Sequence, residues 1–149
     1  MKNAYASLAL QAIISGIVMY LVMFVMIDDL GSFYNNLNMV YMTLMMVAPM
    51  VVLMILAMRH MFPSKTTNGI LLGGSVVIFL GCFALIRTQA TIGDSEFLRS
   101  MIPHHSGAVL MCTQAPVKDP EIAALCGRII KSQREEIDQM KRILARYKA

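Results

Sequence analysis

Three long apolar stretches occupy the first part of the chain. Residues 4–27, 37–58 and 69–86 contain no charged side chain, and each is about as long as a helix that crosses a bilayer. The first stretch exceeds the apolar core of a secretion signal, lacks a clear small-residue cleavage site and runs into Asp28 and Asp29, which favours a retained helix. We therefore expect a membrane domain over residues 1–90 with three transmembrane helices.

From residue 91 onward the pattern becomes amphipathic. Asp94 suits the N-cap of a helix, and Pro103 within the apolar pattern predicts a kink or a restart. Pro116 and the turn at 118–120 end this helix, and Glu121 begins a second one. The second helix carries a seam spaced alternately by four and three residues, formed by Ile122, Cys126, Ile129, Gln133, Glu136, Met140 and Ile143. Residues 91–149 are thus predicted to form an antiparallel helical hairpin.

The expected fold is all-α, with the hairpin resembling half of a four-helix bundle. A hairpin of this size buries too little apolar surface alone, so we expect it to pair with another copy, giving a homo-oligomer, or to pack on the membrane helices. If the hairpin folds antiparallel about residues 118–119, positions whose residue numbers sum to about 237 to 238 should face one another. Three sets of residues then become neighbours: His104 and His105 with Gln133, Cys112 with Cys126, and Met101 with Glu136 and Ile137. Met140 falls within a turn of Met101.

Composition and charge support a membrane protein. Hydrophobic residues make up 57% of the chain and charged residues only 15%, which is unusual for a soluble domain. The net charge of +4 comes largely from the C-terminal helix. We interpret it as a solvated face near anionic lipid, because no nucleic-acid motif accompanies it. The expected partner is the lipid bilayer, and no nucleic-acid partner is expected.

Loop charges predict the orientation of the spans. Lys2 precedes the first span, the loop 28–36 has no Lys or Arg, and the second loop contains Arg59 and Lys65. The positive-inside rule then places the N-terminus in the cytoplasm and the hairpin outside, although Arg87 opposes this weakly. In a bacterium this means the inner membrane with a periplasmic hairpin.

The run from residue 101 to residue 112 carries the candidate chemistry. It contains two imidazoles, two thioethers and one thiol within about three helical turns, and soft sulfur with imidazole favours Cu(I). Residues 101, 105, 108 and 112 share one helical face, while His104 and Met111 lie on its flank. The alternative interpretation is a core stripe of Met, Ala and Cys with one buried histidine.

The cysteines and the methionines of the membrane segments each allow two interpretations. Cys112 and Cys126 are expected to form a disulfide in an oxidising compartment, and the alternative is a thiol pair that binds Cu(I). Cys82 is interpreted as an apolar filler. Methionines recur at 19, 23 and 26, and at every fourth residue from 42 to 58. They suit a thioether path for a soft ion, but flexible packing is the favoured interpretation.

A longer pattern resembles a known family. It consists of Asp94, Phe97, Met101-Ile-Pro-His104-His105, Ala108, Met111, Leu125, Ile129-Ile130, Gln133, Glu136-Ile137 and Met140. Over about residues 94–144 the chain resembles the domain of unknown function 305 family. The resemblance implies a ferritin-like helical architecture and periplasmic copper binding. It implies metal contacts at Met101, His104, His105, Met111 and Met140, supported by Gln133 and Glu136. Cys112 and Cys126 depart from the family pattern, which has small residues there.

Enzymatic function is not expected. A ferritin-like di-iron site needs Glu-x-x-His pairs, which the chain lacks, as it lacks a His-Glu-x-x-His zinc motif and a recognisable nucleophile turn. The sequence predicts a membrane-anchored protein for Cu(I) sequestration or delivery, with a copper-handling protein as a possible partner. The alternative is a structural membrane protein whose hairpin mediates oligomerisation.

The loop charges generate a first prediction about topology. A cysteine introduced at Ser100 should react with an impermeant reagent in intact cells, and one introduced at Lys65 should not, because the two sites lie on opposite sides of the bilayer. Labelling is measured by mass shift before and after lysis. Reaction at position 65 with protection at position 100 would mean that the orientation is inverted.

Overall fold

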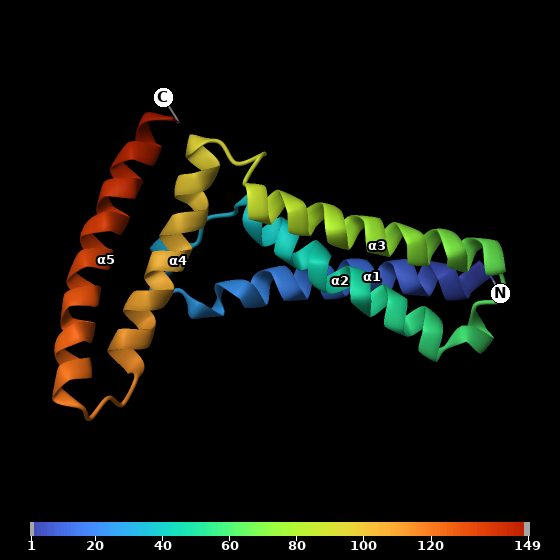
Figure 1. The fold of residues 1–149 in the computed structure, drawn as a ribbon, viewed down its shortest axis with the longest axis horizontal. Coiled ribbons are helices and arrows are strands. Elements are labelled where there is room, and N and C mark those ends of the chain that lie inside the picture. Colours follow the sequence, from blue (N-terminus) through green and yellow to red (C-terminus); the bar gives the residue numbers. More distant parts are fainter. Residues whose placement is uncertain (1, 148–149) are drawn as a thin grey trace. The chain divides into compact units, whose positions relative to one another are not determined.

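The computed structural model describes residues 2–147 and is all-α over that range, as expected. Its elements are α1 (Lys2–Val22), the 3₁₀ helices η1 (Met23–Met26) and η2 (Leu30–Ser32), α2 (Leu37–Ala57), the 3₁₀ helix η3 (Arg59–Met61), α3 (Lys65–Thr88), α4 (Asp94–Gln114) and α5 (Pro120–Arg146) (Figure 1). The described residues contain no β-strand. The expected ranges 1–90 and 91–149 also include residues 1, 148 and 149, which lie outside the description.

Three of the helices are long and apolar enough to cross a membrane, so the chain has the character of a membrane protein. The candidate spans are Ala4–Met26, Leu37–Ala57 and Lys65–Thr88. The third starts before the apolar stretch because Ser64 caps it, its hydroxyl accepting a hydrogen bond from the Thr67 N–H at 3.2 Å. The polar first turn of α3 is therefore helical too.

The chain divides into two compact units. One contains Met1–Val22 and Asn38–Thr91, and the other contains Met23–Leu37 and Ile92–Ala149. The connection between α1 and α2 thus belongs with the hairpin, although the apolar pattern alone gave no sign of this.

In the first unit, an apolar cluster and a polar network join the ends of the helices. Leu8, Ile55 and Phe62 form the buried cluster, and the Tyr5 ring lies 5.3 Å from that of Phe62. The Tyr5 hydroxyl donates to the Asn68 side chain at 2.9 Å and accepts from the Ser64 N–H at 3.2 Å. Tyr5 therefore ties the start of α1 to the turn that leads into α3.

The methionines of α2 divide between two environments. Met42 and Met46 are exposed on the helix, whereas Met54 and Met58 pack against the cluster around Ile55. A four-residue repeat drifts around a helix of 3.6 residues per turn, which explains why the environment changes along α2. The favoured interpretation, apolar packing, accounts for Met54 and Met58.

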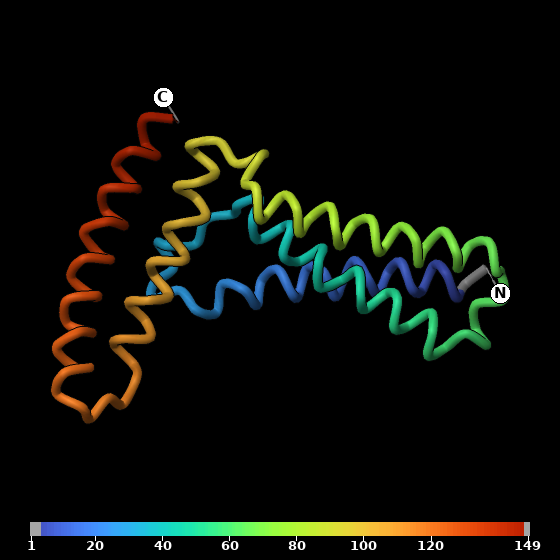
Figure 2. The backbone as a smooth tube through the Cα atoms, in the orientation of Figure 1, coloured from blue at the N-terminus to red at the C-terminus, as the bar shows by residue number. Residues whose placement is uncertain are grey.

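In the second unit, α4 and α5 form an antiparallel hairpin closed at both ends (Figure 2). Its core consists of Leu98, Ile102, Val109, Ile137, Met140 and Leu144. Asp119 caps α5, its carboxylate accepting from the N–H groups of Glu121 and Ile122 at 2.8 and 3.2 Å. At the other end the Tyr147 hydroxyl donates to Asp94 at 3.1 Å, and this hydrogen bond raises the pKa of Tyr147.

The start of α4 differs from the expectation by one residue. Gly93 occupies the N-cap position, with extended backbone, and Asp94 is the first helical residue. A carboxylate in the first turn still interacts favourably with the positive end of the helix dipole. Because Asp94 does not cap the helix, its side chain is available to Tyr147.

Pro103 lies inside a continuous α4 and does not restart the helix. Proline has no N–H, so the carbonyl of Arg99, four residues earlier, loses its usual helical partner. The Asn36 side-chain amide lies 3.5 Å from that carbonyl oxygen and donates to it. Asn36 is itself buried, so the connection between α1 and α2 supplies what the proline removes.

This connection packs along α4 through further polar contacts. The Asp28 N–H donates to the buried Ser106 hydroxyl at 2.7 Å, and the Leu37 N–H donates to the Glu96 carboxylate at 3.1 Å. Just before Asp28, the chain lies so close to Gly107 that a Cβ there would be 3.3 Å from the Met26 carbonyl oxygen. Small side chains at 106 and 107 therefore allow this approach.

The close approach at Gly107 generates a second prediction. Gly107→Val should lower the free energy of unfolding by about 1 to 3 kcal/mol, because the branched side chain displaces the Met26 carbonyl. Denaturant unfolding of the detergent-solubilised chain measures this. Gly127 on α5 has open space around it, and Gly127→Val is the matched control, expected to change stability by no more than about 0.5 kcal/mol. Equal effects of both variants would contradict the docking.

Candidate metal centre

Helix α4 carries four of the five expected metal contacts. Met101 and His105 are partly buried, whereas His104 is exposed and Met111 is 54% exposed. The helix continues through Pro103, so the four side chains keep the helical spacing expected from the sequence. Met101 and His105 therefore lie toward the hairpin interior, and His104 and Met111 lie on the exposed surface of α4.

His105 is held by a carboxylate from α5. Its Nδ1 atom lies 2.9 Å from Glu136 Oε2, and its side chain is only 13% exposed. The Ser132 hydroxyl donates to the other carboxylate oxygen at 2.9 Å, and the Gln133 amide lies 3.5 Å from Oε2. His105 Nδ1 is buried without a hydrogen-bond partner among the described residues, so the carboxylate lies beside the imidazole without fixing which ring nitrogen carries the proton. Carboxylates commonly lie beside histidines that bind metals, where they orient the ring.

Met101 and Met140 come together, but in the hydrophobic core. Met140 is 9% exposed and belongs to the buried cluster, and Met101 packs against it from α4. Their packing alone explains both residues as core methionines. Met101 lies four residues before His105 on α4, one helical turn away and on the same face.

His104 lies on the exposed surface of α4. Its ring makes an edge contact with that of His105, with centroids 5.9 Å apart, yet His104 is exposed where His105 is shielded. Met111 stands seven residues further along α4, about 10 Å along the axis and close to the same direction around it. The two imidazoles therefore have different surroundings, and His104 shares its face with Met111.

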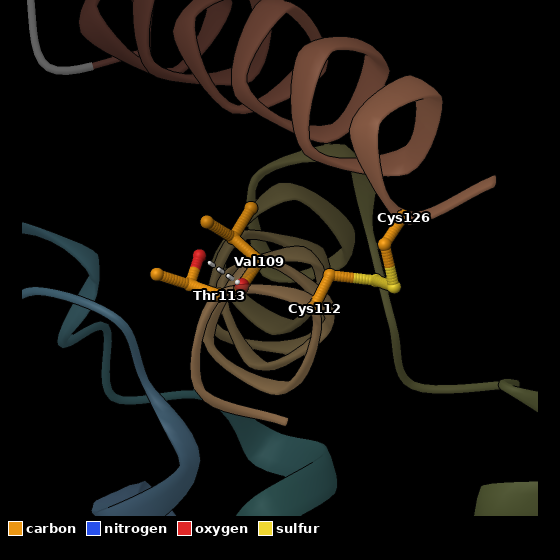
Figure 3. Close-up of a disulfide and its surroundings, with 4 residues drawn as sticks. All are labelled: Val109, Cys112, Thr113 and Cys126. Atoms are coloured by element: carbon orange, nitrogen blue, oxygen red, sulfur yellow. Dashed lines mark hydrogen bonds between the residues drawn. A yellow bond between two sulfur atoms is a disulfide. The ribbon is translucent and has the colours of Figure 1, made fainter. Parts of the chain in front are cut away.

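A disulfide joins Cys112 and Cys126 near the turn of the hairpin (Figure 3). The Cα atoms are 5.1 Å apart and the bridge closes a sequence separation of 14 residues. On the same turn of α4, the Thr113 hydroxyl donates to the Val109 carbonyl at 2.8 Å. The bridge unites the two positions that the hairpin register makes level. Cys82 is a free, buried cysteine within α3.

Two features near these residues were not anticipated from the sequence. Ser132 supports Glu136, and its position four residues before that carboxylate on one helix was the available signal. A polar pocket of about 210 Å³ lies on the other side of the hairpin, lined in part by Asp28, Asp29, Ser106, Arg134, Asp138 and Lys141. It forms where the connection between α1 and α2 docks, which no local pattern indicated.

Over residues 2–147, no group of three or more His, Cys, Asp or Glu side chains is arranged to hold a metal ion.

Comparisons with known proteins assign the hairpin to a family. Residues 84–147 match the family model described as Domain of unknown function (DUF305). A protein of Acanthamoeba polyphaga mimivirus, called Uncharacterized protein L153, is 39% identical over 120 residues, which cover 78% of this chain and 76% of the relative. The chain therefore belongs to the family of proteins with this domain, and the similarity extends beyond the domain. No solved structure matches the chain.

The paired cysteines generate a third prediction. Denatured, unreduced protein treated with an alkylating reagent should gain one alkyl group, at Cys82, and reduced protein should gain three. Intact mass measures both, and Cys82 is the internal control for complete reaction. The bridge is expected to contribute about 3 kcal/mol by closing a loop of roughly 15 residues. Three alkyl groups without reductant would mean that Cys112 and Cys126 are thiols.

Proposed function

We propose that this chain is a membrane-anchored Cu(I)-binding protein that sequesters or delivers copper outside the cytoplasm. The observation that carries the proposal is the His105–Glu136 contact, in which a carboxylate oxygen lies 2.9 Å from Nδ1 of a shielded histidine on the helix that also carries Met101. Imidazole and thioether together are ligands that favour Cu(I) over harder divalent ions.

The proposed ligands fall into two groups. Met101, His105 and Met140 form the inner group, in which the metal ion would lie against the hairpin core, shielded from water. His104 and Met111 form the outer group, which is open to solvent and able to exchange copper with a partner. Glu136, supported by Ser132 and Gln133, orients His105 for the inner group.

The membrane segments would serve as the anchor. Three candidate spans supply far more apolar length than a surface anchor needs. With the N-terminus in the cytoplasm, the hairpin would face the periplasm of a bacterial cell, where a disulfide is stable and where a copper-handling partner could reach the outer group. Association of hairpins into a four-helix bundle, as the small core favours, is part of this proposal.

The fourth prediction tests the ligands. Replacing both His104 and His105 by Ala should remove most Cu(I) binding, because each proposed group loses its only nitrogen donor. Met111→Leu should weaken the outer group alone. The measurement is a competition titration of the detergent-solubilised chain against a chromogenic Cu(I) chelator under reducing conditions. His60→Ala is the control, since His60 lies in the turn η3, in the other compact unit.

Two outcomes would contradict the proposal. One is unchanged Cu(I) stoichiometry and affinity in a folded double variant. The other is wild-type protein that binds no Cu(I) at all, which would favour a hairpin that serves oligomerisation.

A further inference from the structure

The connection that follows α1 brings a second methionine, Met26, to the outer group. Figure 2 shows this part of the chain passing beside the middle of α4. At the crossing, a Cβ built on Gly107 would lie 3.3 Å from the carbonyl oxygen of Met26 and 3.8 Å from its Cβ. The side chain of Met26 therefore starts directly at the surface of α4.

The crossing point stands between the two exposed ligands of α4. Gly107 is three residues after His104 and four residues before Met111, and residues at these spacings are surface neighbours with Cβ atoms about 5 to 6 Å apart. A methionine side chain with three rotatable bonds can span such distances. The Met26 side chain therefore begins beside the turn of α4 that lies between His104 and Met111, which are about 10 Å apart along the axis.

Met26 is held in place while its side chain remains accessible. Phe24, two residues earlier, is buried, and the N–H of Asp28, two residues later, is bonded to Ser106. Met26 itself is 48% exposed, close to the 54% of Met111. The backbone on both sides is thus anchored, and the thioether is not needed for the core.

Helix α5 offers no free soft donor to His104 or Met111. Its sulfur-containing residues are Cys126, which is in the disulfide, and Met140, which is in the buried cluster, and it has no histidine. Within this unit, the connection before α2 is therefore the segment that can complete the outer group.

We propose that Met26, His104 and Met111 form a Cu(I) site of one chain, at the point where the first candidate span ends. This inference rests on the proposed Cu(I) function and adds a ligand from outside the DUF305 domain. Two thioethers and one imidazole are a soft, uncharged donor set suited to a monovalent ion such as Cu(I) or its air-stable analogue Ag(I). Gly107 is required because a larger side chain would occupy the place of Met26.

The experiment compares three variants of the full chain in detergent, each titrated with Cu(I) against a chromogenic chelator. Met26→Leu removes the sulfur and keeps a similar volume, and it should lower the affinity of the outer site by about tenfold or more, as Met111→Leu does. Met42→Leu is the matched control, an exposed methionine of α2, and should leave binding unchanged. X-ray absorption of the copper-loaded protein should show fewer sulfur ligands per copper in Met26→Leu than in wild type.

A fourth variant separates the sulfur from its position. Gly107→Val retains every donor but displaces Met26, so a folded Gly107→Val protein should weaken the outer site as Met26→Leu does. Wild-type affinity and sulfur count in Met26→Leu, together with weakened binding in Met111→Leu, would overturn this site and leave the proposed function standing. If Met26→Leu binds like wild type and the protein also forms a dimer only when Cu(I) is added, the third ligand of the outer site comes from a second copy. Absence of Cu(I) binding by the wild type would overturn the proposed function itself.

Discussion

The candidate metal centre depends on the packing of the connection between α1 and α2 against α4. Buried Ser106 accepts the Asp28 N–H, and the neighbouring Gly107 leaves room for the Met26 backbone. A buried hydroxyl that lost this partner would cost about 1 to 3 kcal/mol. With one side of α4 covered by this connection and another by α5, the remaining side is the one that carries His104 and Met111. Their accessibility is thus a consequence of how the other two sides are filled.

The same packing explains why α4 tolerates a proline in its interior. A proline inside a helix usually costs about 3 kcal/mol or more, through a lost hydrogen bond and a steric clash. Here the Asn36 side-chain amide donates a hydrogen bond to the Arg99 carbonyl, which Pro103 leaves without its helical donor. The polar connection and the irregularity of α4 are therefore complementary. Neither the asparagine nor the proline is explained by the segment in which it lies.

Features that follow from local periodicity could be predicted from the sequence. The apolar stretches predict α1, α2 and α3, and folding the hairpin about residues 118–119 predicts the register that places Cys112 opposite Cys126. Docking of residues 23–37 could not be predicted, because Ser32 and Asn36 are polar residues whose burial no apolar pattern indicates. The Ser32 hydroxyl donates to Asp29 within the same segment, and the Asn36 amide donates to the Arg99 carbonyl of α4. The apolar stretch 4–27 predicts a candidate span that includes Met26, but it gives no sign that the Met26 backbone also lies against α4. The family pattern implies Met140 as a ligand, and the structure places Met140 in the hydrophobic core. A methionine suits both roles, so the sequence alone does not distinguish a core residue from a metal ligand.

The two helices of the hairpin are linked at both ends, by the Cys112–Cys126 disulfide near the turn and by the Tyr147–Asp94 hydrogen bond at the open end. Between the two cysteines the chain exposes a turn rich in small and polar residues, which is the kind of segment that proteases cut first. A single cut there would leave α4 and α5 covalently connected through sulfur. The face that carries the histidines would then stay assembled after a cut in its own loop.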